Sequence, residues 1–191
     1  MSRGNNSFTI KADTAGIDAF LSGLGSELEG NVRDIAQAGA EVLYQEVRRN
    51  VAGLKQRRGN LLRSIYQVYS KDDSGPRRAI YHISWNASKA PHGHLLEYGY
   101  LQRYKYYVDK KGVVRPMVRP EMVGKPPPAS GGYNRAALDA YYVPRDGGPK
   151  QIAGRAFVRT AADKMPMAVE AMRTRLDRVL AKYQKNGGSR S

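Results

Sequence analysis

The stretch VRDIAQAGAEVLYQEVRRNV, residues 32–51, decides how this chain folds. Its apolar residues recur at spacings of three and four, which places them on one stripe of an α-helix. The charged residues mostly fall outside that stripe. The pattern therefore predicts a long amphipathic helix with one buried face. The stripe consists of Val32, Ile35, Ala36, Gly39, Val42, Leu43, Val47 and Val51.

A second long stripe lies near the other end of the chain, within residues 154–183. It predicts a second amphipathic helix, in which Pro166 either kinks the helix or occupies its first turn after Asp163. A weaker helical pattern runs from Ile17 to Leu28. Gly23 and Gly25 within it and Gly30 just after it predict a bend or a break, since each glycine costs about 1 kcal/mol inside a helix relative to alanine.

Two short segments between the helices have the composition of β-strands. From Ile65 onward, β-branched and aromatic residues alternate, and AIYHISWN, residues 79–86, does so more clearly. The polar segment KDDSGPRR, 71–78, separates them as a turn. Together they predict an antiparallel hairpin.

Residues 100–155 differ in composition from the rest of the chain. They hold seven of the ten prolines, seven of the 13 tyrosines and a net charge of +7. Within them, 104–118 predicts a β-hairpin around an Asp-Lys-Lys-Gly turn, and GKPPPASGG, 124–132, predicts a stiff polyproline-like segment. We interpret the region as an inserted arm that contributes little to the core.

The expected fold class is α+β, with a small antiparallel β-sheet packed against two long amphipathic helices and an arm of β-hairpin and proline-rich chain. The expected divisions are an N-terminal extension at 1–25, a core domain at 26–99 and 154–184, the arm at 100–153 and a flexible tail at 185–191.

Composition narrows the classes of protein to consider. The 191 residues include no cysteine, which excludes disulfides, thiolate metal sites and cysteine catalysis. We expect no membrane span, because no apolar run of about 18 residues occurs, and no signal peptide, because the N-terminal stretch MSRGNNSFTIKADT is polar. The formal net charge of +15 favours contact with a polyanion or an acidic protein partner.

The segment PHGHLLEYGY, 91–100, is the strongest candidate for chemistry, because it contains His92, His94 and Glu97. Two histidines at i and i+2 share a face only on a strand, and Pro91 and Gly93 disfavour one. The sequence favours a structural loop and a short helix ending at Gly99, in a C-cap position. A metal site that also uses His82 is the minor alternative.

No familiar catalytic motif is present. The sequence lacks GxSxG, GxxxxGK[ST], GxGxxG and HExxH, and no base accompanies Ser64. We therefore expect no enzyme activity, no catalytic residue, no metal and no cofactor.

The arm carries the other candidate residues. Tyrosine and arginine are typical anchors of protein interfaces, although aromatic residues among basic ones also suit nucleic acid. We favour a protein interface for Tyr104, Tyr106, Tyr107, Val113, Val114, Tyr133, Tyr141 and Tyr142. The candidates for contact with DNA or an acidic partner are Arg103, Lys105, Lys110, Lys111 and Arg115.

Three motifs occur in a familiar order: RRGNLLRSI at 57–65, HLLEYG at 94–99 and GRAFVRTA at 154–161. Their order and spacing resemble the neck or tail-completion proteins of long-tailed bacteriophages, also described as minor tail or head–tail joining components. Arg58 replaces the usual threonine of the first motif, and the last lacks its prolines. The matched signature residues are Gly59, Leu61, Ser64, Ile65, Leu96, Glu97, Tyr98, Gly99, Phe157 and Arg159.

This resemblance implies a structural virion protein at the head–tail junction, assembled in the host cytoplasm. It implies a homo-oligomeric ring, expected to be hexameric, that joins the tail tube to the connector. The expected partners are other neck, connector and tail-tube proteins, with non-specific contact to packaged DNA and no membrane. Glu97 would be a signature residue without a catalytic role. The alternative from another class is a free basic nucleic-acid-binding protein, and a hydrolase built on His92, His94 and Glu97 is the least favoured.

Overall fold

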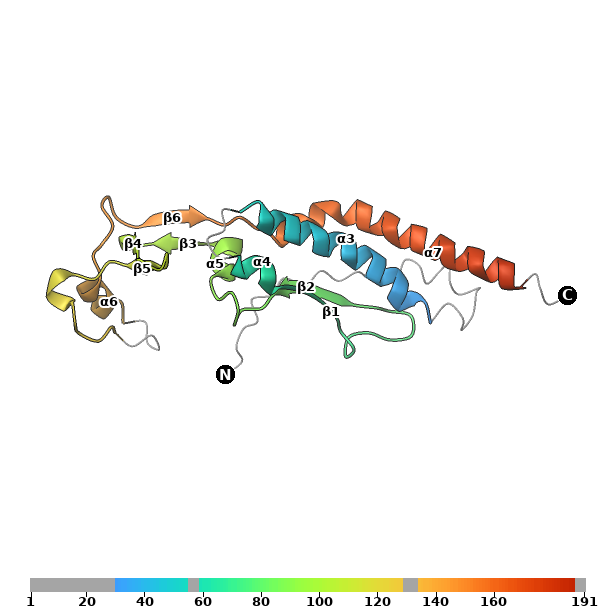
Figure 1. Ribbon diagram of the computed structural model, residues 1–191, viewed down its shortest axis with the longest axis horizontal. Helices are drawn as coiled ribbons and strands as arrows, with labels where there is room; N and C mark the ends of the chain where they lie inside the picture. Colours follow the sequence, from blue (N-terminus) through green and yellow to red (C-terminus); the bar gives the residue numbers. More distant parts are fainter. Residues whose placement is uncertain (1–29, 55–58, 129–133, 188–191) are drawn as a thin grey trace. The chain divides into compact units, whose positions relative to one another are not determined.

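The computed structural model describes residues 30–54, 59–128 and 134–187, with side chains as far as residue 182. The chain divides into two compact units, which are described separately. Unit 1 comprises residues 1–97 and 156–191, and unit 2 comprises residues 98–155. Figure 1 shows the elements of both units. The expected helix at 17–28 lies outside the described residues.

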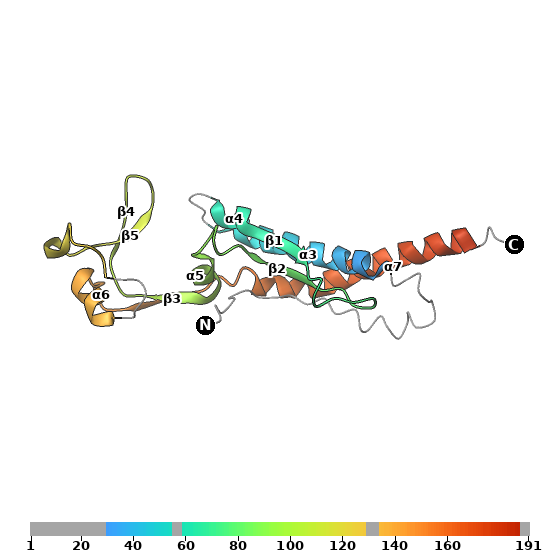
Figure 2. The same ribbon diagram turned by 90° about the horizontal axis from the view of Figure 1, so that it is seen from below.

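Two long antiparallel helices form one side of unit 1 (Figures 1 and 2). Helix α3 spans Val32–Ala52, and α7 spans Met165–Gly187. Gly39 lets the helices approach closely, because a Cβ at this position would lie 2.8 Å from Cγ of Met172. The predicted helices are thus confirmed, and Pro166 occupies the first turn of α7 rather than a kink. A 3₁₀ turn at Arg159–Lys164, η2, precedes α7.

The predicted hairpin is confirmed on the other side of α3. Strands β1, Ile65–Tyr69, and β2, Tyr81–Trp85, pair antiparallel, with Ile65 opposite Trp85. Because side chains alternate between faces, Ile65, Ile83 and Trp85 enter the core. Tyr66 and Val68 lie on the opposite face and are exposed.

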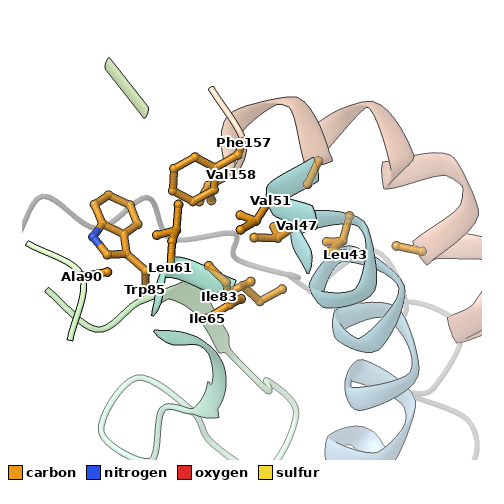
Figure 3. Packing of buried hydrophobic residues seen from close by; sticks show 12 residues of the cluster. Leu43, Val47, Val51, Leu61, Ile65, Ile83, Trp85, Ala90, Phe157 and Val158 are labelled. Atoms are coloured by element: carbon orange, nitrogen blue, oxygen red, sulfur yellow. The ribbon is translucent and has the colours of Figure 1, made fainter. Parts of the chain in front are cut away.

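The main core of unit 1 joins the two helices to this hairpin (Figure 3). The Trp85 and Phe157 rings pack edge to face, with centroids 5.5 Å apart. Burying each large apolar side chain stabilises the fold by about 1.5–3 kcal/mol. The buried members of this core are Leu43, Val47, Val51, Leu61, Ile65, Ile83, Trp85, Ala90, Phe157, Val158, Ala161 and Ala168.

Two antiparallel strand pairs organise unit 2. Strand β3, Gly99–Gln102, pairs with β6, Lys150–Ala153, and β4, Tyr106–Val108, pairs with β5, Val114–Pro116. The predicted hairpin within 104–118 is therefore confirmed. The remaining elements are the 3₁₀ turn η1 at Pro120–Met122 and helix α6 at Arg135–Tyr141.

The α+β fold class is confirmed, although the strands form three separate two-stranded sheets. The short helix predicted before Gly99 is α5, Gly93–Tyr98, and a further short helix, α4, spans Asn60–Ser64. Within the described residues, no helix is both long and apolar enough to cross a membrane.

Candidate functional site

The carboxylate of Glu97 is wholly buried and bound by donors from the segment that leads into η2. Its Oε2 accepts from the backbone N–H of Val158 at 2.9 Å. Its Oε1 accepts from the backbone N–H and from the side-chain Nε of Arg159, both at 3.1 Å. The backbone carbonyl of Glu97 accepts from Nη2 of Arg159 at 2.9 Å and from the N–H of Ala156.

The Glu97 carboxylate caps the start of the helical segment η2. The first N–H groups of a helix have no partner within it, and an acceptor supplied from elsewhere satisfies them. An ionised carboxylate is costly to bury unless it is paired and hydrogen-bonded, and Glu97 is both. Glu97 therefore fastens α5 to the chain before α7, which is a structural role.

The first two signature motifs supply the rest of the same core. Gly59 has φ of 65° and precedes α4, a conformation that glycine adopts without steric cost. Leu61 and Ile65 are buried in the core of unit 1, and Leu96 packs against it. Ser64 Oγ donates to the Leu61 carbonyl at 2.7 Å. Sequence motifs about 30 residues or more apart thus meet around Phe157.

Two signature residues lie at the start of unit 2 and do not join that core. Tyr98 is exposed. Gly99 has φ of +82°, and a Cβ there would lie 2.3 Å from the carbonyl oxygen of Ile152. The positive φ and the close approach of β6 together explain why glycine stands at this position.

The three histidines do not form one cluster, and each has its own surroundings. His94 Nδ1 lies 2.7 Å from the carbonyl oxygen of Pro91, and His82 lies 3.5 Å from the carboxylate of Asp73. His92 is exposed. Across residues 30–54, 59–128 and 134–187, no group of three His, Cys, Asp or Glu residues could hold a metal ion.

The ribbon formed by β4 and β5 exposes an apolar face. Val108 stands opposite Val114, and Tyr106 stands opposite Pro116, so these four residues share one face. Val108 and Val114 are each 51% exposed, and Tyr106 is 41% exposed. The other face pairs Tyr107 with Arg115. Backbone hydrogen bonds of Lys105 with Val143 and Met117 join the base of the ribbon to the rest of unit 2, so the apolar face lies on a supported ribbon and is open to a partner.

A second exposed apolar pair lies on unit 1. Tyr66 and Val68 occupy the outer face of β1, 38% and 48% exposed. Contiguous apolar surface of this kind often marks a protein interaction site. We call Tyr66 and Val68 the hairpin face, and Tyr106, Val108, Val114 and Pro116 the ribbon face.

Three of the tyrosines expected at an interface also pack on one another within unit 2, where Tyr104 and Tyr142 are half-buried. Tyr141 is buried and donates its hydroxyl to the Lys125 carbonyl at 2.7 Å. The Tyr142 ring packs on those of Tyr104 and Tyr141, with centroids 5.3 Å and 4.9 Å away. Their recurrence in a basic, proline-rich segment gave no signal of this internal packing. Val113 is half-buried beside the turn, and Tyr133 lies outside the described residues.

Tyr104 also binds a carboxylate from helix α6. Its hydroxyl donates to Oδ1 of Asp139 at 2.7 Å. Burial, followed by this hydrogen bond, raises the pKa of the Tyr104 phenol, and the same bond lowers the pKa of Asp139. The two residues are 35 positions apart, so sequence spacing did not indicate the contact.

Two of the five cations expected to face DNA or an acidic partner form ion pairs within unit 2. Lys105 Nζ lies 2.8 Å from Asp146, and Arg115 Nε lies 2.8 Å from Asp109. Lys110 and Lys111 are exposed in the turn between β4 and β5, and Arg103 is half-buried. The turn is therefore where the expected basic surface is most accessible.

Comparison of the chain with family models, with curated proteins and with solved structures finds no match.

Proposed function

We propose that this chain is a structural subunit of a long-tailed bacteriophage neck, forming an oligomeric ring that joins the tail tube to the connector at the head–tail junction. The exposed ribbon face carries the proposal. A subunit that is built into an assembly needs apolar surface that its own fold leaves accessible, and Val108 and Val114 provide it.

The resemblance of the three motifs supports the same proposal. In the fold, the signature residues from these motifs serve packing and helix capping: Leu61, Ile65 and Phe157 are buried in one core, and Glu97 binds Arg159. This is the role expected of residues that preserve a scaffold. Glu97 has no exposed surface through which it could act on a substrate.

We further propose that the partner of the ribbon face is the hairpin face of a second copy. Two different patches that fit each other form a head-to-tail contact, and such contacts close into rings when the rotation between subunits permits. Both patches consist of a tyrosine beside valine on a two-stranded antiparallel pair. Sheet faces with such residues pack well against each other.

Lysine substitutions test this contact directly. We expect Val68→Lys to disable the hairpin face and Val108→Lys with Val114→Lys to disable the ribbon face, so that each variant stays monomeric in light scattering. The matched control is Val123→Lys, because Val123 is 71% exposed and lies on neither face. It should assemble like the unmodified protein.

Mixing the two disabled variants distinguishes a head-to-tail ring from other assemblies. Each retains the face that the other lacks, so the mixture should form dimers and no rings. Rings formed by either variant alone would contradict the proposed contact. Negative-stain images of the unmodified chain, alone and with phage tails, test the assignment to the neck: absence of both rings and added density at the tail end would overturn it.

A further inference from the structure

Each acidic residue of unit 2 forms an ion pair with a basic residue of the same unit. Its 58 residues contain four carboxylates, and all four lie in ion pairs within the unit. Besides Asp109 and Asp146, described above, Asp139 lies 3.4 Å from Arg135, and Glu121 lies 3.8 Å from Arg119. The 11 basic residues therefore leave a net charge of +7 on this small unit.

Two of these basic residues, Lys110 and Lys111, stand at the end of the β4–β5 ribbon, in a turn closed by hydrogen bonds to Asp109. Oδ1 of Asp109 accepts from the backbone N–H groups of Lys111 at 2.9 Å and Val113 at 2.7 Å. Gly112 has φ of +73°, and its N–H donates to the Asp109 carbonyl at 2.8 Å. Since these hydrogen bonds already fix the backbone of the turn, contacts made by Lys110 and Lys111 need not order the backbone as well.

The composition of the turn favours a phosphate backbone over an acidic protein surface. Residues 109–112 contain no aromatic or arginine anchor of the kind that dominates protein interfaces, from which lysine is depleted. Lysine ammonium groups are point charges, which suit phosphate contacts without base recognition.

We propose that the end of the β4–β5 ribbon binds double-stranded DNA without sequence preference, through phosphate contacts made by Lys110 and Lys111. The ribbon face, Tyr106, Val108, Val114 and Pro116, is apolar and takes no part. A single copy of the chain carries both lysines, so this binding does not depend on assembly into a ring.

The salt dependence of binding measures the number of phosphate contacts. For duplex DNA, the slope of log K against log salt is about −0.9 for each phosphate that a cation neutralises. We expect the full chain to bind a labelled duplex of mixed sequence in fluorescence anisotropy. The double variant Lys110→Ala with Lys111→Ala should reduce the steepness of this slope by about two.

The matched control removes the same charge elsewhere. Lys71 and Lys89 are exposed lysines of unit 1, so Lys71→Ala with Lys89→Ala lowers the net charge equally. Its slope should equal that of the unmodified chain. Equal slope changes in both double variants would show that only overall charge matters and would overturn the proposal.

Competition separates DNA from an acidic protein partner. Poly-glutamate should displace the duplex only weakly, and its binding should be unaffected by the Lys110 and Lys111 substitutions. Failure of the unmodified chain to bind DNA at about 50 mM salt, together with tight binding to poly-glutamate that requires both lysines, would assign the turn to an acidic protein instead. Ring formation is scored separately by light scattering, so loss of DNA binding in a chain that still forms rings contradicts this inference alone.

Discussion

The Glu97 carboxylate binds both the backbone N–H and the guanidinium of Arg159, 62 residues further along the chain. This contact connects the second signature motif to the third and ties the start of η2 and α7 to α5. Because the carboxylate is fully buried, breaking this pair should cost more free energy of folding than breaking a surface ion pair. It also explains why a glutamate, rather than another polar residue, stands between Leu96 and Tyr98.

We expect Glu97→Gln to destabilise unit 1 by about 3 kcal/mol, because it removes the charge and turns one acceptor into a donor that faces backbone N–H groups. The measurement is urea unfolding followed by fluorescence of Trp85, the single tryptophan, which lies in the core of unit 1. Asp34→Asn is the control, because the pair of Asp34 with Arg175 is more than 40% exposed and should contribute less than about 1 kcal/mol. Equal losses in both variants would contradict the assigned role.

Gly93 provides the space that the Trp85 ring occupies. A Cβ at Gly93 would lie 2.3 Å from Nε1 and 2.6 Å from Cδ1 of Trp85. We expect Gly93→Ala to destabilise the fold by about 2 kcal/mol and to red-shift Trp85 emission, because overpacking forces the ring outward and outweighs the helix preference of alanine.

Gly75 offers a matched comparison for that substitution. Apart from Gly75 itself and its two chain neighbours, no atom lies within 4 Å of the position its Cβ would take, so Gly75→Ala should change stability by less than about 0.5 kcal/mol and leave the emission unchanged. An unshifted emission maximum in Gly93→Ala would show that the indole ring does not need this space.

Periodicity in the sequence was enough to predict the long helices α3 and α7 and the strands β1 and β2 of unit 1. The stripe from Val32 to Val51 and the alternation in β1 and β2 arise from burial on one face, which leaves a regular pattern in the chain. The contact of Glu97 with Arg159 left no such pattern, because it depends on how two distant segments pack.

Unit 2 was harder to predict for the same reason. Its tyrosines suggested an interface, and their spacing did not indicate that Tyr104, Tyr141 and Tyr142 also pack on one another. Sequence alone also gave no sign that Asp146 would pair with Lys105 or that Asp109 would pair with Arg115. Such pairs bring together residues whose separation follows no helical or strand period.

The turn of the β4–β5 ribbon should respond to acid through Asp109. The hydrogen bond from Arg115, followed by that from the Val113 N–H, lowers the pKa of Asp109. A carboxyl group whose pKa is lower in the folded chain stabilises it above the ordinary value of about 4, and this contribution is lost as the pH falls through the lowered pKa. We therefore expect the amide NMR signals of Lys111 and Val113 to shift in acid, with a midpoint below about pH 4.

Removing Arg115 tests the cause of that midpoint. In Arg115→Ala, the largest contribution to the lowered pKa is gone, so the midpoint should rise towards the ordinary value. Arg119→Ala is the control, since Arg119 pairs with Glu121 and does not contribute to the pKa of Asp109. A midpoint that stays constant in Arg115→Ala would show that the backbone hydrogen bonds alone determine it.

Unit 1 should fold without unit 2, because the buried clusters of unit 1 contain no residue of 98–155. Tyr100 pairs with Ile152, so a short glycine-containing turn can replace residues 101–151 and close the β3–β6 pair. We expect this deletion to leave the urea midpoint reported by Trp85 nearly unchanged, while ring formation and joining to tails are lost along with the ribbon face. Loss of the cooperative Trp85 transition in the deletion variant would contradict the view that residues 98–155 are an insertion into an otherwise complete fold.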